Sequence, residues 1–285
     1  MQSNNPVFNR SEGFNGRGTT TARSSDPSQW HIDLNQPQGN GYPTIGVDDR
    51  MTIDSVVQKT GMTLGLVIAT AAVTWVAIGQ MFDADGFAEP GAMQRAIGFA
   101  AAGAIVGLVL SLVNSFKRVI SPALVLAYAV AEGVFVGALS KVAATFVGDT
   151  SIVAQAVVGT MVAFLATLAA YKFFNIRVTD KFRKVVTISI FAFVGATLIN
   201  FVLSITGVIN NGGIRGFNTL GLIVSAIAVV LAVFMLILDF DFVERGVEAG
   251  LPERESWRAA FGLTVTLIWL YIEMIRILMI LRGND

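Results

Sequence analysis

Long, nearly uncharged apolar segments recur along most of this chain and constrain its fold more than any other feature. A helix of about 20 apolar residues, rising 1.5 Å per residue, is long enough to cross the ~30 Å hydrocarbon core of a bilayer. Inside that core each backbone polar group needs an internal partner, so such segments must be helical. The sequence predicts an all-α, seven-transmembrane-helix bundle, with spans over residues 61–82, 92–113, 122–146, 152–174, 185–209, 217–243 and 259–281.

Composition places the chain among membrane proteins and excludes several kinds of chemistry. The sequence is 54% hydrophobic and 14% charged, which is too little charge to cover a soluble protein of 285 residues. The formal net charge is zero, which argues against a nucleic-acid partner held through its phosphates. There is no cysteine, and the only histidine, His31, precedes the spans, so thiolate chemistry and an imidazole site in the membrane are excluded. We expect no enzyme activity and no bound cofactor.

The chain divides into a polar tail and a helical domain. Residues 1–50 are rich in Asn, Gly, Ser, Gln and Thr, cannot bury enough apolar surface to fold, and are predicted to be disordered. No apolar signal-peptide core precedes the first span. Residues 51–283 form the predicted seven-helix domain, entered through an amphipathic segment at residues 51–59 with Thr52 as the helix N-cap.

Basic residues near the ends of the spans predict the orientation in the membrane, because cytoplasmic loops carry an excess of Lys and Arg. One side carries Arg50, Lys59, Lys117, Arg118, Lys172, Arg177, Lys181, Arg183, Lys184, Arg245, Arg254 and Arg258. The other side carries only Arg95, Lys141, Arg215 and Arg282. The tail is therefore predicted to be cytoplasmic and the C-terminus to lie outside.

Glycines four residues apart predict where helices pack closely, since the missing side chain lets two backbones approach. The pairs are Gly61/Gly65, Gly103/Gly107 and Gly133/Gly137.

Acidic residues inside the spans are the candidates for function, because a charge at mid-membrane costs roughly 2.5–3.5 kcal/mol even on lenient scales. Asp239 directly follows the apolar run VVLAVFMLIL and is expected to be buried. Asp241 lies about 200° further around the same helix, so it is expected to be solvated or to pair with Arg245, one turn on. Glu132, in the third span, is either a buried acid bonded to a neighbouring helix or a member of the same acidic cluster.

Glu273 and Arg276 are three residues apart in the last span and share a helix face. They can form an ion pair that keeps the helix insertable, or a carboxylate whose protonation the arginine tunes, and these interpretations are compatible. A cluster of such carboxylates in a bundle can exchange a proton for a cation, which is typical of a proton-gated cation path.

Three segments in order resemble the Bax inhibitor-1/YccA-like family, also called the transmembrane Bax inhibitor motif family. They are AYAVAEGVFVG (Ala127–Gly137), LDFDFVERG (Leu238–Gly246) and LYIEMIRIL (Leu270–Leu278). The resemblance covers about residues 51–283, and the long polar tail is similar to that of a bacterial branch. It implies a multi-pass protein of a bacterial plasma membrane.

The resemblance further implies a pH-sensitive Ca²⁺ leak channel with two acids as its proton sensor. Asp239 matches the first acid and Glu273 the second, and together they are the candidate weak Ca²⁺ ligands, with Ca²⁺ as permeant ion. The 34 residues between them exceed the family spacing. Asp239 lies about four residues from the cytoplasmic end of its span and Glu273 about fourteen into the next, so two straight helices would separate them by about 15 Å along the membrane normal. The candidate charge partners are Arg276, Arg282, Lys117 and Arg118.

A second interpretation is a membrane-embedded interaction protein that modulates a partner such as a membrane protease, or a stress response, through helix contacts. An intramembrane aspartyl protease is disfavoured, because the nearest candidate motif, Gly148-Asp149, lies in a loop.

Overall fold

The computed structural model describes residues 50–82, 86–174, 176–210 and 212–283, and within them the chain is helical without β-strands. All seven long helices of this part are apolar and long enough to cross a membrane, which confirms the predicted all-α fold. The predicted disordered tail lies outside the described residues, apart from Arg50. The elements are α1 (Ile53–Ile78), α2 (Ala92–Phe116), α3 (Pro122–Val147), α4 (Ser151–Phe173), α5 (Asp180–Ile205), the 3₁₀ turn η4 (Gly213–Arg215), α6 (Thr219–Glu248) and α7 (Glu255–Arg282).

Several helices begin or end outside the predicted spans. Thr52 caps α1 as predicted, with its hydroxyl accepting from the Ser55 amide at 3.1 Å, so the amphipathic segment and the first span are one helix. The loop expected over residues 244–258 is mostly helical, since α6 continues to Glu248 and α7 begins at Glu255. A helix keeps its backbone hydrogen bonds beyond the membrane core, so charged residues there do not end it.

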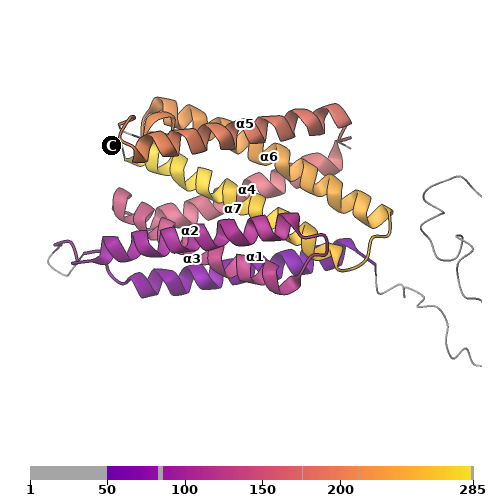
Figure 1. The fold of residues 1–285 in the computed structure, drawn as a ribbon, viewed down its shortest axis with the longest axis horizontal. Coiled ribbons are helices and arrows are strands. Elements are labelled where there is room, and N and C mark those ends of the chain that lie inside the picture. Colours follow the sequence, from indigo (N-terminus) through magenta and orange to yellow (C-terminus); the bar gives the residue numbers. More distant parts are fainter. Residues whose placement is uncertain (1–49, 83–85, 175, 211, 284–285) are drawn as a thin grey trace, which may run out of the picture. The chain divides into compact units, whose positions relative to one another are not determined.

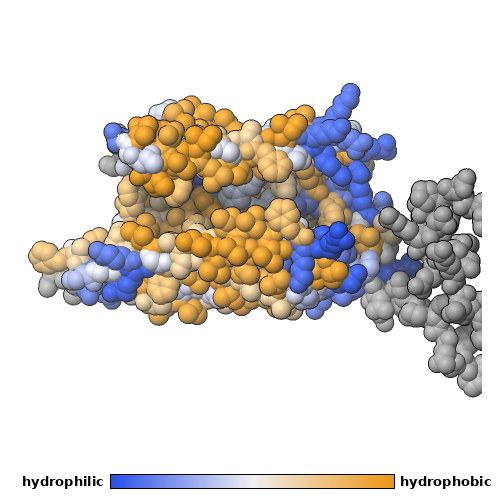
Figure 2. All heavy atoms as spheres, in the orientation of Figure 1, coloured by the Kyte–Doolittle hydropathy of each residue, from blue (hydrophilic) through white to orange (hydrophobic). Residues whose placement is uncertain are grey.

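The last helix, α7, is the centre of the bundle. It packs against α1, α3, α4 and α6, and it crosses the bundle diagonally in Figure 1. Leu267, Leu270 and Ile275 lie on its buried surface. By contrast the backbone of α5 lies close mainly to α6 and η4, and that of α2 mainly to α3 and α1, within the described residues. Figure 2 shows a hollow on this face between the layer that holds α5 and the layer that holds α2.

Two of the three predicted glycine pairs are helix contacts. A Cβ on Gly137 would lie 2.4 Å from the Ala71 carbonyl oxygen of α1, and one on Gly103 would lie 2.6 Å from the Phe135 backbone nitrogen of α3. Both distances are shorter than any van der Waals contact allows, so only glycine permits α3 to approach α1 and α2 this closely.

The prediction for the pair Gly61/Gly65 is wrong. Both glycines are exposed on α1, and a Cβ there would meet nothing within 4 Å outside its own helix. The spacing places two glycines on one helix face, but it does not determine whether another helix covers that face.

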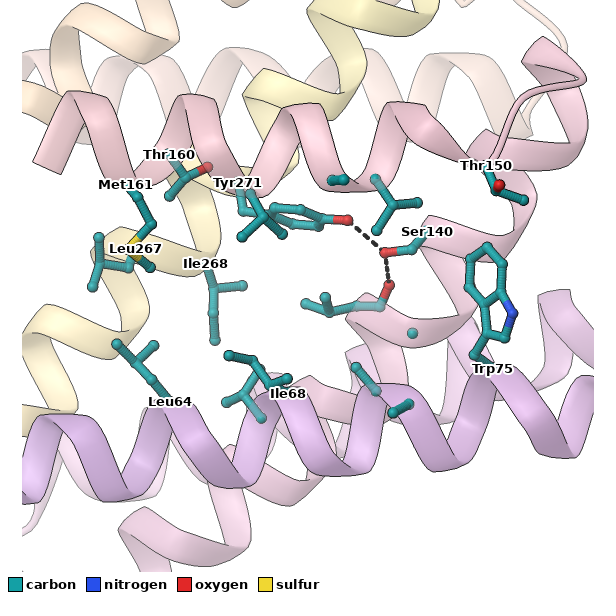
Figure 3. Close-up of a pocket in the computed structure, with 18 of the residues that line it drawn as sticks. Leu64, Ile68, Trp75, Ser140, Thr150, Thr160, Met161, Leu267, Ile268 and Tyr271 are labelled. Carbon is teal, nitrogen blue, oxygen red and sulfur yellow. Dashed lines mark hydrogen bonds between the residues drawn. The ribbon is translucent and has the colours of Figure 1, made fainter.

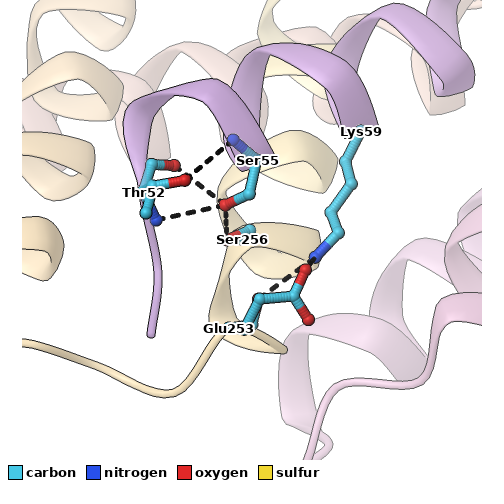
Figure 4. A network of polar contacts seen from close by, with 5 residues as sticks. All are labelled: Thr52, Ser55, Lys59, Glu253 and Ser256. Atoms are coloured by element: carbon cyan, nitrogen blue, oxygen red, sulfur yellow. Dashed lines mark hydrogen bonds and ion pairs between the residues drawn. The ribbon is translucent and has the colours of Figure 1, made fainter. Parts of the chain in front are cut away.

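Polar contacts join the first helix to the start of the last helix and to the loop before it, at the end of the bundle where both helices begin (Figure 4). Lys59 forms an ion pair with Glu253, and the Ser55 hydroxyl lies 2.6 Å from that of Ser256. Figure 2 shows hydrophilic residues gathered towards this end and hydrophobic ones over the middle of the bundle. This distribution fits a chain whose middle lies in lipid.

Candidate functional site

Asp239 lies on α6 against the middle of α7. Its Oδ2 accepts a hydrogen bond from the Thr266 hydroxyl at 2.6 Å, and its Oδ1 is 3.4 Å from where a Cβ on Gly262 would be. Gly262 and Thr266 are one turn apart on α7. Gly262 leaves room for the carboxyl, and the Thr266 hydroxyl donates a hydrogen bond to it. Among the described residues, Asp239 has no basic side chain within ion-pair distance. This half-buried acid therefore has a neutral hydroxyl, and no basic side chain of the described residues, as its polar partner.

Glu273 is almost completely buried, with 1% of its surface exposed, and its partner is Arg215. The Arg215 Nη2 donates to Oε1 at 2.7 Å and Nη1 donates to Oε2 at 3.1 Å. This two-pronged geometry matches the planar guanidinium to the planar carboxylate and gives a strong, oriented pair. It fixes the end of α7 to the segment between α5 and α6.

Arg215 reaches Glu273 because a buried amide folds the segment that carries it. The Asn200 Nδ2 donates to the Gly212 carbonyl at 3.0 Å, and the Asn200 Oδ1 accepts from the Ile214 amide at 3.0 Å. Gly212 has φ of 76°, in the left-handed region that glycine adopts without strain. Asn200 thus closes the turn that aims Arg215 into the bundle.

Arg276, the partner expected for Glu273, lies elsewhere. Its Nη2 donates to the Gly216 carbonyl at 3.4 Å, and its guanidinium carbon lies 5.2 Å from the centroid of the Phe217 ring. The expected ion pair with Glu273 is replaced by the Arg215 pair, because Arg215 approaches from outside α7 and can meet both carboxylate oxygens at once.

Asp241 is buried, with 5% exposed, and forms two ion pairs. The expected pairing with Arg245 is present, with Nε to Oδ1 at 2.9 Å, and the Arg183 Nη2 of α5 adds a second at 2.7 Å. Arg245 also donates to the Val178 carbonyl at 3.0 Å. The Asp241 cluster therefore joins α6 to the start of α5.

Glu132 faces α2 rather than the acids of α6 and α7. A Cβ on Gly107 of α2 would lie 2.7 Å from the Glu132 Oε1, so the carboxyl occupies the space that this glycine leaves. Its hydrogen-bonding partner is Tyr128, one turn earlier on its own helix, whose ring packs edge-on against Phe261 of α7 at 5.0 Å between centroids. Glu132 is thus partly buried and bonded to its own helix rather than to a neighbouring one, and it is separate from the other acids.

The two acids predicted to act as one sensor lie at different levels of the bundle. Asp239 contacts Thr266, and Glu273 follows Thr266 by seven residues, which is about 10 Å along α7. The offset is smaller than the separation of about 15 Å anticipated from the sequence, but it still separates the two acids. The contacts of Asp239 and Glu273 therefore form two sites, and no group of three or more acidic, histidine or cysteine side chains that could hold a metal occurs in the described part of the chain.

The remaining predicted charge partners contact none of these acids. Lys117 and Arg118 are exposed after the end of α2. Arg282 instead forms an ion pair at 2.8 Å with Asp149, in the turn between α3 and α4. Hydrogen bonds from Ser151 and the Arg282 guanidinium lower the pKa of the exposed Asp149 carboxyl. The Arg282–Asp149 pair joins the end of α7 to the turn between α3 and α4.

Arg215, Arg183 and Thr266 are the site residues that sequence reasoning missed. A signal for Arg215 was present, because the turn after the fifth span lies on the same side of the membrane as the second half of the last span. An estimate of the depth of Glu273 along the last span would have placed Glu273 near that turn, and so near Arg215.

Comparison with known proteins agrees with this architecture. No curated protein matches the chain. The family described as Bax inhibitor 1 like matches residues 5–283, so the similarity begins within the polar tail rather than at residue 51. With seven helices able to span a membrane in the described residues, the chain belongs to the Bax inhibitor 1-like family of multi-pass membrane proteins.

Proposed function

We propose that this protein conducts cations, Ca²⁺ among them, along the contact between α6 and α7, and that protons regulate the flow. The observation that carries the proposal is Asp239, a half-buried carboxylate on a spanning helix whose hydrogen-bond partner among the described residues is the neutral Thr266. A charge in this position is costly, and acids of this kind mark ion and proton paths in membrane proteins.

The neighbouring ion pairs support the proposal by bracketing Asp239. The Asp241 cluster lies on one side, where α6 meets α5, and the Glu273–Arg215 pair lies on the other, where η4 meets α7. In the proposed mechanism these two clusters close the path at its ends. A proton on either cluster acid removes the charge that holds its arginine, and so loosens that end.

Asp239 acts between them as the cation site. Ca²⁺ prefers about six to eight oxygen ligands, so one carboxylate with a threonine hydroxyl and water makes a weak site with fast exchange. Such a site suits conduction rather than storage. Protonation of Asp239 removes its charge and with it the attraction for a cation, so flux falls when this acid takes up a proton.

The test is Ca²⁺ entry into liposomes that hold the full chain and a trapped calcium indicator, measured over a range of pH. We expect flux above that of protein-free liposomes, with a pH dependence that Asp239→Asn flattens. Glu248→Gln is the matched control, since Glu248 is an exposed acid at the end of the same helix. Absence of flux at every pH would overturn the proposal and favour the second interpretation, a protein that acts through a membrane partner.

A further inference from the structure

A cavity of about 580 Å³ lies between α1, α3, α4 and α7, apart from the acids (Figure 3). Trp75 and Thr150 lie at one end of the cavity, and Leu64, Met161 and Leu267 at the other. Its volume is within the roughly 300–1,000 Å³ of known small-molecule pockets. The cavity is thus elongated along the helices and large enough for a ligand.

The cavity opens sideways between α1 and α4. These two helices both line it but do not pack against each other in the described residues. Lining residues at the opening, Ile68 and Val76 of α1 and Val157 of α4, are exposed. Both helices are apolar enough to span a membrane, so the opening faces the acyl chains of lipids.

The polar groups in the cavity need no partner from a ligand. The Tyr271 hydroxyl and the Ser140 hydroxyl are 2.6 Å apart, and Ser140 donates to the Val136 carbonyl at 2.6 Å. Tyr271 therefore donates to Ser140, and both hydroxyls are satisfied within the protein. The remaining lining is almost entirely apolar, which favours a hydrocarbon chain over a polar ligand.

The ammonium group of Lys141 lies at the Trp75 end of the cavity. The Lys141 Nζ lies 4.4 Å from the centroid of the Trp75 ring and has no acidic partner among the described residues. Trp75 is three residues from the end of α1 and Lys141 six from the end of α3, about 5 and 9 Å along their axes. Tryptophan and lysine at this depth are typical of the headgroup region, where basic residues between helices bind lipid phosphates.

We infer that this cavity binds a phospholipid, with one acyl chain between α1 and α4 and the headgroup phosphate at Lys141. The apolar lining accounts for the chain, the sideways opening for its entry from the bilayer, and the unneutralised ammonium for the phosphate. The inference does not depend on cation conduction. It assigns a bound lipid to a part of the bundle in which the proposed cation path does not run.

Native mass spectrometry of the full chain in detergent tests the inference, with phosphatidylglycerol added to delipidated protein. We expect one lipid to bind well above the background of further additions. Val157→Trp should fill the cavity and weaken this binding about tenfold, equivalent to about 1.4 kcal/mol. Val158→Trp is the matched control, because Val158 is the next residue of α4, is 61% exposed and does not line the cavity. If both variants bind phosphatidylglycerol equally well, the inference that the cavity is the lipid site is wrong.

The headgroup is tested with Lys141→Gln and with diacylglycerol, which has the chains but no phosphate. We expect Lys141→Gln to weaken phosphatidylglycerol several-fold and to leave diacylglycerol unchanged. If diacylglycerol binds the unmodified protein as tightly as phosphatidylglycerol, the assignment of the phosphate to Lys141 is wrong.

Photo-crosslinking covers the case in which Val157→Trp does not fold. Phosphatidylglycerol with a diazirine in its acyl chain should label the facing surfaces of α1 and α4 in the unmodified protein. Labelling confined to other helices, or a dimer that excludes lipid from this opening, would contradict the inference.

Discussion

Arg215 holds Glu273 through the two terminal nitrogens of its guanidinium, although 58 residues separate the two along the chain. The pair joins the turn between α5 and α6 to α7, the helix that packs against four others. Since the carboxylate is buried, the arginine is what makes its charge tolerable inside the bundle.

Arg215→Ala should therefore destabilise the protein by up to roughly 3 kcal/mol, because it leaves Glu273 buried without its cation. Adding Glu273→Gln should recover much of the loss, since the buried charge is then gone. Unfolding by denaturant in detergent micelles measures both. A double variant no more stable than Arg215→Ala would show that the arginine acts through packing and not through this carboxylate.

Asp239 and Glu273 should behave as independent sites. Their contacts lie about 10 Å apart along α7, and residues at that separation without shared partners are usually additive. The effects of Asp239→Asn and Glu273→Gln on the free energy of unfolding should add within about 0.5 kcal/mol. The contrasting pair is Asp239→Asn with Thr266→Val, which change the acceptor and remove the donor of one hydrogen bond, so their effects should be non-additive. Non-additive effects for Asp239 and Glu273, with additive effects for Asp239 and Thr266, would indicate that the two acids share a proton.

Gly137→Ala should destabilise the bundle by about 1–3 kcal/mol, because its Cβ would overlap the Ala71 carbonyl and force α3 away from α1. Gly61→Ala is the control: α1 there is open on its outer face, so the change should be neutral or slightly stabilising. Thermal melting in detergent compares them. Equal melting temperatures would mean that α1 and α3 can separate at little cost.

Acid should weaken the link between Asp149 and Arg282. The pKa of Asp149 is lowered in the folded protein, so this acid contributes stability at pH above its ordinary value of 3.8. The contribution is lost as the pH falls from that value through the lowered one. Asp149→Asn should thus lower the melting temperature at neutral pH, and its difference from the unmodified protein should vanish in strong acid. A difference that persists there would assign the effect to the neutral hydrogen bonds with Ser151.

Hydropathy was enough to predict the seven helices, because the length and apolarity of each span are properties of that span alone. The partners of the acids were harder to predict. Spacing within one helix suggested Arg276 for Glu273 and Arg245 for Asp241, and only the second pair forms. Arg215 depends on how Asn200 folds a turn in a different part of the chain, which no spacing within α7 encodes.

The same limit explains the glycines. Gly61 and Gly137 are each part of a pair at spacing four, but only Gly137 faces another backbone. Whether a face is covered depends on the order of helices around the bundle. In this chain no helix covers the side of α1 that carries Gly61, whereas α3 covers another side of α1.

The central place of α7 has a consequence for how the protein is made. A ribosome delivers these helices one after another, so the helix on which α1, α3, α4 and α6 all pack is the last of the seven to enter the membrane. Until then α1, α2 and α3 can pack on one another, but the central surface that α7 supplies is missing, and Glu273 has not yet met Arg215. The contacts at the centre of the bundle can therefore form only after the last helix has inserted. A stop codon before residue 255 should leave six inserted helices that cell quality control recognises as an orphan, and α7 supplied as a separate chain should rescue them.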